Sequence, residues 1–130
     1  MYKLYSTNAP KTQVIEQLLV KDNEAVSVGE LFKLSAGRLT KASGTDKPEF
    51  VSVGVREAGV NVFVPVVRIM ETDIYETELN ADGTALNIGD AVTVGEDGLT
   101  VTATTEQGVF TLTDIIGTEV GSKVRGMFRR

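Results

Sequence analysis

Hydrophobic and polar residues alternate along several stretches of this chain. Valine occupies positions 51, 53 and 55, and again positions 60, 62, 64 and 66. Residues 99–102 and 109–113 alternate in the same way. A period of two residues is typical of β-strands with one buried face. The pattern therefore predicts a strand in each of the four stretches.

The residue types agree with this pattern. Val, Ile and Thr make up 39 of the 130 residues, and 13 glycines are spread between the alternating stretches. Side chains branched at Cβ suit a pleated sheet better than a helix, and regularly spaced glycines favour turns between short strands. We therefore predict an all-β fold, either a small barrel or a sandwich. Pro65 cannot donate a backbone hydrogen bond, so its strand is expected at a sheet edge or with a bulge.

The first part of the chain is less clear than the rest. Residues 12–21 place Val14, Ile15, Leu18 and Leu19 at helical spacing after Thr12, which could cap a short helix. The same residues would also suit a strand followed by a turn at 22–23, and both alternatives remain open. We assign residues 1–24 to an N-terminal segment, an extended arm or short helix, and residues 25–130 to the β domain.

The chain also resembles itself at a distance of 60 residues. Residues 25–34 match residues 85–94, so that Val28-Gly29-Glu30 corresponds to Ile88-Gly89-Asp90. Phe50 corresponds to Phe110 at the same offset. A fixed offset indicates an internal duplication. We predict two similar β halves, residues 25–68 and 85–128, joined by residues 69–84, which include one more strand.

Composition excludes several kinds of chemistry. The chain contains no His and no Cys, which rules out thiolate metal sites and the usual nucleophile–histidine pairs of hydrolases. The net charge of −5 argues against nonspecific binding of nucleic acid. No apolar run approaches the ~20 residues that cross a membrane, and Met1 to Ser6 do not resemble a signal peptide. We expect neither nucleic acid nor membrane as a partner, and a cytoplasmic site of synthesis.

Two acidic stretches were weighed as sites. Glu78, Asn80, Asp82 and Gly83 match the first positions of a calcium loop, but Gly89 replaces the glutamate required at position 12. A simple turn explains them equally well. Glu71, Asp73, Glu76 and Glu78 could supply paired carboxylates, although a solvated strand face is the simpler account. We predict no catalytic residue, no bound metal and no cofactor.

The two chain ends carry the candidate contact residues. Tyr2, Leu4 and Tyr5 could anchor an extended arm on a partner, or could belong to an ordinary first strand. Near the other end are four basic residues, Lys123, Arg125, Arg129 and Arg130. They could complement an acidic partner, or could simply face water from a terminal strand. On the first alternative, residues 25–122 would fold without either end.

The order of strands and turns resembles a known family. The residues concerned are Val28 to Leu34, Gly37 to Ala42, Asp46-Lys47-Pro48, Phe50 to Val55 and the turn and strand from Gly59 to Val64. This succession is similar to that of the head decoration, or cement, proteins of tailed bacteriophages. The resemblance covers about residues 25–68, with a fainter echo at 85–128.

The resemblance implies a function that the composition does not oppose. It implies a non-enzymatic structural protein, made in the host cytoplasm, that binds the lattice of major capsid protein on the virion exterior and stabilises it. It also implies a homo-oligomer, often a trimer. The alternative is a carbohydrate- or surface-binding β module, which the low aromatic content of 6% and the lack of Trp disfavour. A small enzyme using carboxylates is the third hypothesis.

Overall fold

The structure is a computed structural model that describes residues 1–7 and 14–128. The described residues form eleven strands and no helix, which confirms the all-β prediction. The strands are β1 (Lys3–Thr7), β2 (Ile15–Leu19), β3 (Leu31–Ser35), β4 (Arg38–Lys41), β5 (Phe50–Ser52), β6 (Phe63–Arg68), β7 (Asp73–Leu79), β8 (Ala91–Val92), β9 (Thr100–Val101), β10 (Phe110–Ile115) and β11 (Lys123–Phe128). Within these ranges, no helix is long and apolar enough to span a membrane.

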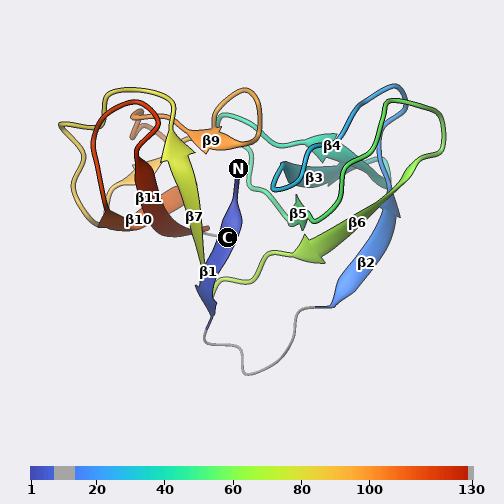
Figure 1. The fold of residues 1–130 in the computed structure, drawn as a ribbon, viewed down its shortest axis with the longest axis horizontal. Coiled ribbons are helices and arrows are strands. Elements are labelled where there is room, and N and C mark those ends of the chain that lie inside the picture. The colour runs from blue at the N-terminus through green and yellow to red at the C-terminus, as the bar shows by residue number, and fades with distance from the viewer. Residues whose placement is uncertain (8–13, 129–130) are drawn as a thin grey trace.

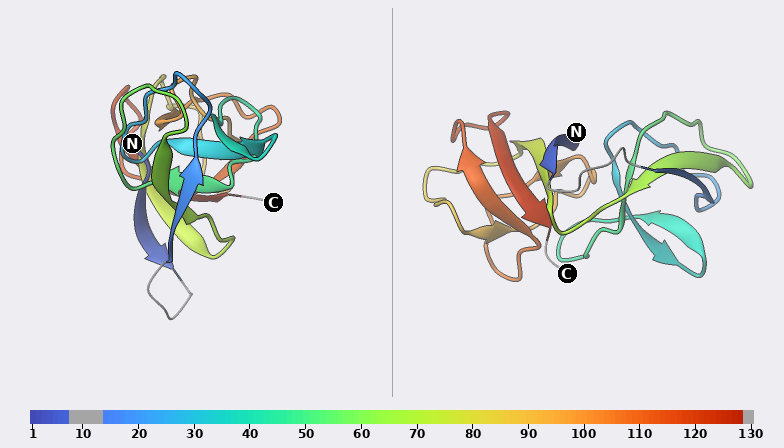
Figure 2. Two further views of the ribbon diagram at one scale, coloured as in Figure 1. Left: turned by 90° about the vertical axis from the view of Figure 1, so that its right-hand side faces the viewer. Right: turned by 90° about the horizontal axis from the view of Figure 1, so that it is seen from below.

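The strands form two sheets that pack together as a sandwich, the second of the two architectures predicted. One sheet has the order β2-β6-β5-β3-β4. The other has the order β1-β7-β11-β10-β8, and β9 adds to β7 in parallel. Neither sheet closes into a barrel in the part of the chain that is described. Figures 1 and 2 show the sheets as two lobes side by side, which we call the first half (residues 15–68) and the second half (residues 73–128).

Strand pairing repeats between the halves at the offset found in the sequence. β5 pairs with β6 in the register Phe50 to Arg68, and β10 pairs with β11 in the register Phe110 to Phe128, 60 residues later for both partners. The pair Phe32–Phe50 likewise becomes Val92–Phe110. Equal register in two sheets places equivalent side chains on equivalent faces. The two halves therefore share one plan of strand pairing.

The repeated unit is larger than the sequence match indicated. β2 pairs with β6 in the first half, and β7 pairs with β11 in the second half, so β2 and β7 are equivalent at an offset of 59. The parallel pairs Val20–Leu39 and Leu79–Val101 also correspond. The strand expected within residues 69–84 is therefore the first strand of the second half rather than a connection between halves.

The N-terminal segment is built into the sheets. β1 pairs with β7, and β2 pairs with all of Phe63 to Val67 on β6. Neither a free arm nor a short helix is formed by the described residues before position 25, while residues 8–13 of the helix candidate lie outside them. Leu18 packs on the first-half core, so pairing with β6 outweighs a weak helical pattern. Residues 25–122 alone would lack two paired strands, which contradicts the prediction that they fold without the ends.

Strand limits in the first half differ slightly from the alternating pattern. β6 begins at Phe63 instead of residue 60, because Asn61 turns the chain with a left-handed φ of 54°. Its N–H donates to the Asp22 carboxylate at 3.1 Å. The edge position expected for Pro65 is wrong, since β6 lies between β2 and β5. The proline is tolerated because its nitrogen faces the end of β5, beyond Ser52, where no ladder bond is lost.

Two hydrophobic cores stabilise the sandwich. The core of the first half is enclosed within it and contains Phe32, Leu39, Phe50, Val64 and Val66. The larger core fills the second half and continues into the first through Leu31, Ala42, Val51, Val67 and Ile69. This shared core fixes the two halves against each other.

Backbone hydrogen bonds cross the same boundary. Gly44 and Val94 exchange two bonds of 2.8 and 3.0 Å, and Leu31 N–H donates to Gly98 C=O at 2.9 Å. Tyr2 N–H donates to Gly29 C=O at 2.9 Å. The boundary thus combines apolar packing with satisfied backbone groups, as in the interior of one domain.

We predict that Tyr2 and Tyr5 differ sharply in their contribution to stability. Tyr2 is 3% exposed and packs against Phe110 and Phe128, whereas Tyr5 is 55% exposed. Tyr2→Ala should lower the free energy of unfolding by about 3–5 kcal/mol, as expected for a buried aromatic residue. Tyr5→Ala, the matched control, should cost less than about 1 kcal/mol. Urea unfolding of both variants measures this difference, and equal losses would contradict the placement of β1.

Candidate binding face

The residues nominated at the N-terminus lie in three different environments. Tyr2 is buried, its hydroxyl donates to the Thr100 C=O at 2.8 Å, and burial raises its pKa well above the usual value. Leu4 is partly buried against the shared core. Tyr5 is exposed, but the guanidinium carbon of Arg125 lies 3.8 Å from the centre of its ring. Tyr2 is therefore a core residue and not an anchor for a partner.

The basic residues nominated near the C-terminus are paired within the chain. Arg125 contacts the carboxylates of Glu76 at 2.9 Å and Asp114 at 3.1 Å. Lys123 lies 3.1 Å from Glu78, which also receives a 2.8 Å contact from the N-terminal ammonium. Arg129 and Arg130 lie outside the described residues. The charges of Lys123 and Arg125 are thus largely satisfied by β7 and β10.

These ion pairs explain most of the acidic stretch at 71–78. Burial acts to raise the pKa of Glu78, but hydrogen bonds from the N-terminal ammonium and Lys123 outweigh it, so this pKa is lowered. Glu76 faces Arg125 directly across the β7–β11 ladder. The stretch was expected to be a solvated face, and only Glu71 among its four acids is exposed.

Other acidic residues close turns. A carboxylate accepts a hydrogen bond from the N–H three residues earlier in four turns, formed by Ser27 and Glu30, Ser43 and Asp46, Met70 and Asp73, and Asn87 and Asp90. Asp82 accepts the Thr84 N–H at 2.9 Å. No group of three potential metal ligands occurs among the described residues. The carboxylates that were weighed as chemical groups therefore have structural partners.

The turns at Glu30 and Asp90 show why the sequence repeat is conspicuous there. Each carboxylate closes its turn over a glycine with positive φ, +76° at Gly29 and +99° at Gly89. Residues with a Cβ rarely adopt this conformation. The motif Val/Ile-Gly-acid is thus a turn motif that starts a strand in each half.

The outer faces of the two halves differ in chemistry. On β2 and β6, the face that includes Ile15, Gln17, Phe63, Pro65 and Val67 is mainly apolar. The equivalent positions on β7 and β11 are Ile74, Glu76, Lys123, Arg125 and Met127. The second half therefore carries ion pairs at positions where the first half carries apolar side chains.

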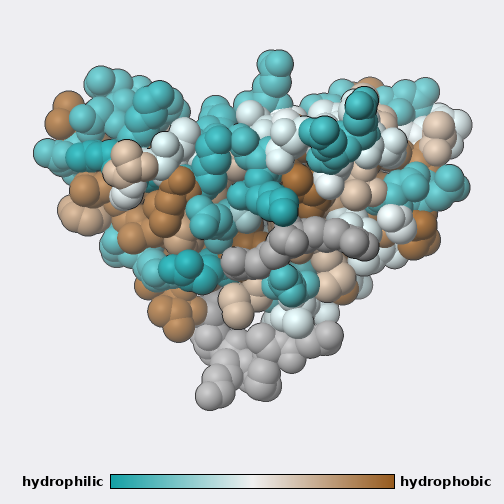
Figure 3. Space-filling model, turned by 180° about the vertical axis from the view of Figure 1, so that it is seen from behind, coloured by the Kyte–Doolittle hydropathy of each residue, from teal (hydrophilic) through white to brown (hydrophobic). Residues whose placement is uncertain are grey.

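Part of the apolar face is open to solvent. Ile15 is 59% exposed, Phe63 is 55% exposed and Val53, which follows β5, is 42% exposed. In the view of Figure 3, hydrophobic side chains gather on the side of the first half. We call Ile15, Val53, Phe63 and Pro65 the apolar face of the first half. Exposed apolar residues that are contiguous are typical of a surface that binds another protein.

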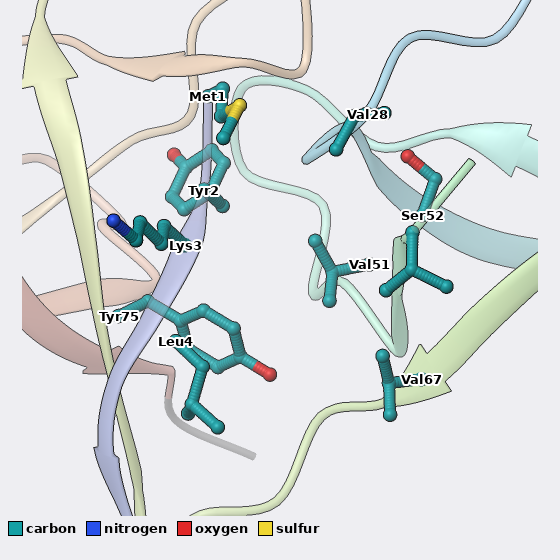
Figure 4. Close-up of a pocket in the computed structure, with 10 residues that line it drawn as sticks. Met1, Tyr2, Lys3, Leu4, Val28, Val51, Ser52, Val67 and Tyr75 are labelled. Atoms are coloured by element: carbon teal, nitrogen blue, oxygen red, sulfur yellow. The ribbon is translucent and has the colours of Figure 1, made fainter. Parts of the chain in front are cut away.

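A groove of about 200 Å³ continues this face between the two halves. Its walls are Leu4 and Tyr75 on one side and Val28, Val51, Val53 and Val67 on the other, as Figure 4 shows for most of them. Lys3 and Ser52 add polar groups to the lining. Val53 belongs to both surfaces, so the groove and the apolar face form one continuous binding region.

Sequence analysis did not identify this region. The usable signal was the comparison of the repeats, since Phe63 and Pro65 align with Lys123 and Arg125 at the offset of 60. Comparison with known proteins adds no name to it, because no family model matches the chain and no curated protein matches it.

We predict that the charge of Glu30 destabilises the fold. Glu30 is 3% exposed; burial raises its pKa, as do Glu24 and Asp97, against the hydrogen bond from Ser27 and the charge of Lys41. A pKa raised in the folded state stabilises the protein below the unfolded value of 4.5, and this stabilisation is lost as pH rises through the folded value.

Replacing the carboxylate by an amide tests this assignment. Glu30→Gln keeps an acceptor for Ser27 N–H, so it should flatten the fall in the free energy of unfolding above pH 4.5. Urea unfolding across this pH range measures the effect, with the exposed Glu106→Gln as control. A variant as pH-dependent as the parent protein would contradict the prediction.

Proposed function

We propose that the protein is a non-enzymatic structural protein that binds the outer surface of a phage capsid lattice and stabilises the shell. The observation that carries the proposal is the apolar face of the first half, together with the groove beside it. This face lies within the residues that resemble head decoration proteins, apart from Ile15 on β2. Binding a lattice needs shape and many modest contacts, and such a surface supplies them.

The arrangement of polar groups supports binding rather than catalysis. The carboxylates that were weighed as acids or bases close turns or pair with Lys123 and Arg125. A base must lie within hydrogen-bond reach of a substrate proton and have freedom to transfer it. The carboxylates of Asp73, Glu76 and Glu78 are instead held by partners within the chain.

The alternative function, a carbohydrate-binding module, has less support. Such modules stack sugar rings on exposed aromatic side chains. Among the described residues, the exposed aromatic side chains are Tyr5 and Phe63, and Arg125 already stacks on Tyr5. A flat platform of several rings is therefore not available on this part of the chain.

The duplication offers a precise test of the proposed binding region. Phe63→Lys and Val53→Thr give the first half the residues that the second half carries at positions 123 and 113. Both side chains are substantially exposed, so folding should be retained. Co-sedimentation with undecorated phage capsids should show binding by the parent protein and at least about tenfold weaker binding by the double variant, as for loss of a central contact.

Matched substitutions on the second half provide the control. Ile88 and Val120 are 66% and 69% exposed, and Ile88→Thr with Val120→Thr should leave capsid binding unchanged. Equal losses from both double variants, or no loss from Phe63→Lys with Val53→Thr, would place the interface elsewhere. A parent protein that sediments with no candidate capsid would refute the proposed function itself.

A further inference from the structure

The two edges of strand β2 are not equivalent. Val53 N–H donates to Pro65 C=O at 2.9 Å, so the backbone polar groups of Pro65 face β5 and not β2. Gln17 lies opposite Pro65, and the two form a pair without mutual hydrogen bonds. The N–H and C=O groups of Gln17, and of Ile15 two residues earlier, therefore point away from β6.

The second half shows what occupies this position on the equivalent strand. Ile74 and Glu76 of β7 correspond to Ile15 and Gln17, and they pair with Ser6 and Lys3 of β1. Further along, the bridge Val20–Leu39 matches the pair Leu79–Val101. The two halves thus differ at this edge in one respect. No strand in the described part of the chain pairs with β2 at Ile15 and Gln17.

The other exposed edges carry features that discourage pairing. β1 is interrupted by an irregularity between Leu4 and Ser6 and carries Lys3, and β8 is only two residues long. β2 has five residues in unbroken register, with neither Lys nor Pro among them. Native proteins usually protect a long regular edge, because its unpaired backbone groups accept another strand. Val14 and Ile15 at this edge are 75% and 59% exposed.

We propose that this edge of β2 pairs with the same edge of a second copy, giving a two-fold symmetric dimer through antiparallel β2 strands. With the axis at Glu16, Ile15 of each copy lies opposite Gln17 of the other, and both pairs can exchange two backbone hydrogen bonds. Pairing farther along the strand is blocked, because the bridge to Leu39 occupies that end of β2.

Charge at the axis is compatible with this pairing. The two Glu16 side chains would face each other, which is unfavourable for unpaired carboxylates. Each Glu16, however, contacts its own Arg68 at 3.3 Å, so the axis carries two ion pairs with no net charge. The short ladder implies a weak dimer. The dimer does not depend on the proposed capsid function, and it differs from the trimer that the family resemblance implies.

A single cysteine at the axis tests the arrangement directly. Residues opposite each other without mutual hydrogen bonds have Cα atoms about 4.5 Å apart, which a disulfide can span. The chain has no Cys, so Glu16→Cys introduces the only thiol. Oxidised glutathione should convert two such chains into a disulfide-linked dimer and release two reduced glutathiones. The control, Glu106→Cys on an exposed loop, should crosslink several-fold less.

A proline variant separates this edge from other surfaces. Gln17→Pro removes an N–H that makes no ladder bond to β6, so the monomer should keep its unfolding midpoint. Sedimentation velocity at up to about 1 mM should show the parent protein approaching twice 14.0 kDa and the proline variant remaining at 14.0 kDa.

Four results would overturn the dimer. They are a parent protein that stays monomeric at the highest concentration, a trimer, a proline variant that dimerises like the parent, and equal crosslinking of the two cysteine variants. The crosslinking comparison remains decisive if Gln17→Pro fails to fold. A monomer whose Ile15 and Gln17 amides are already protected from hydrogen exchange would show that the edge is not open, which also overturns the proposal.

Discussion

The antiparallel register between one central pair of strands in each half, β5 with β6 and β10 with β11, is the constraint on which the structure depends. In both halves an aromatic residue, Phe50 or Phe110, lies at the same point of this ladder. A slip of one residue would move every side chain of the strand to the opposite face. Phe50, Val64 and Val66 would then leave the core of the first half. The remaining strands add to this ladder in the same order in both halves.

The two halves are nevertheless not independent. The larger core crosses the boundary, and Gly44, Val94, Leu31 and Gly98 connect the sheets through backbone hydrogen bonds. Tyr2 inserts from β1 among the aromatic residues of the second half and donates its hydroxyl to Thr100. A groove lined by residues of both halves is therefore held in a fixed shape, which favours binding without a large cost of ordering.

Duplication explains how one framework acquired two kinds of surface. Positions that face a core are restricted by packing, so Phe50 and Phe110 remain alike. Positions on the outer face lack this restriction, and there Phe63 and Pro65 correspond to Lys123 and Arg125. In the second half the outer face is ion-paired and its edge is covered by β1. In the first half the outer face is apolar, and the structure describes no strand on the equivalent edge.

Local patterns in the sequence were sufficient for the strands, the turns and the duplication. Alternating valines and the Gly-acid turns depend on interactions between residues close in the chain, so their periodicity and spacing are visible without a structure. The limits of β6 were less accurate, because the turn at Asn61 depends on Asp22, 39 residues away. The edge position of Pro65 failed for a similar reason, since it depends on where β5 ends.

Only the tertiary structure decided which exposed-looking residues are buried and which charges are free. Tyr2 and Tyr5 are indistinguishable as sequence, yet one enters the shared core and the other lies under Arg125. Lys123 and Arg125 have no acidic residue near them in the chain, but β7 brings Glu78 and Glu76 directly opposite. Contacts between distant segments are set by sheet order and register, which local patterns do not encode. The apolar face and the open edge of β2 became visible for the same reason.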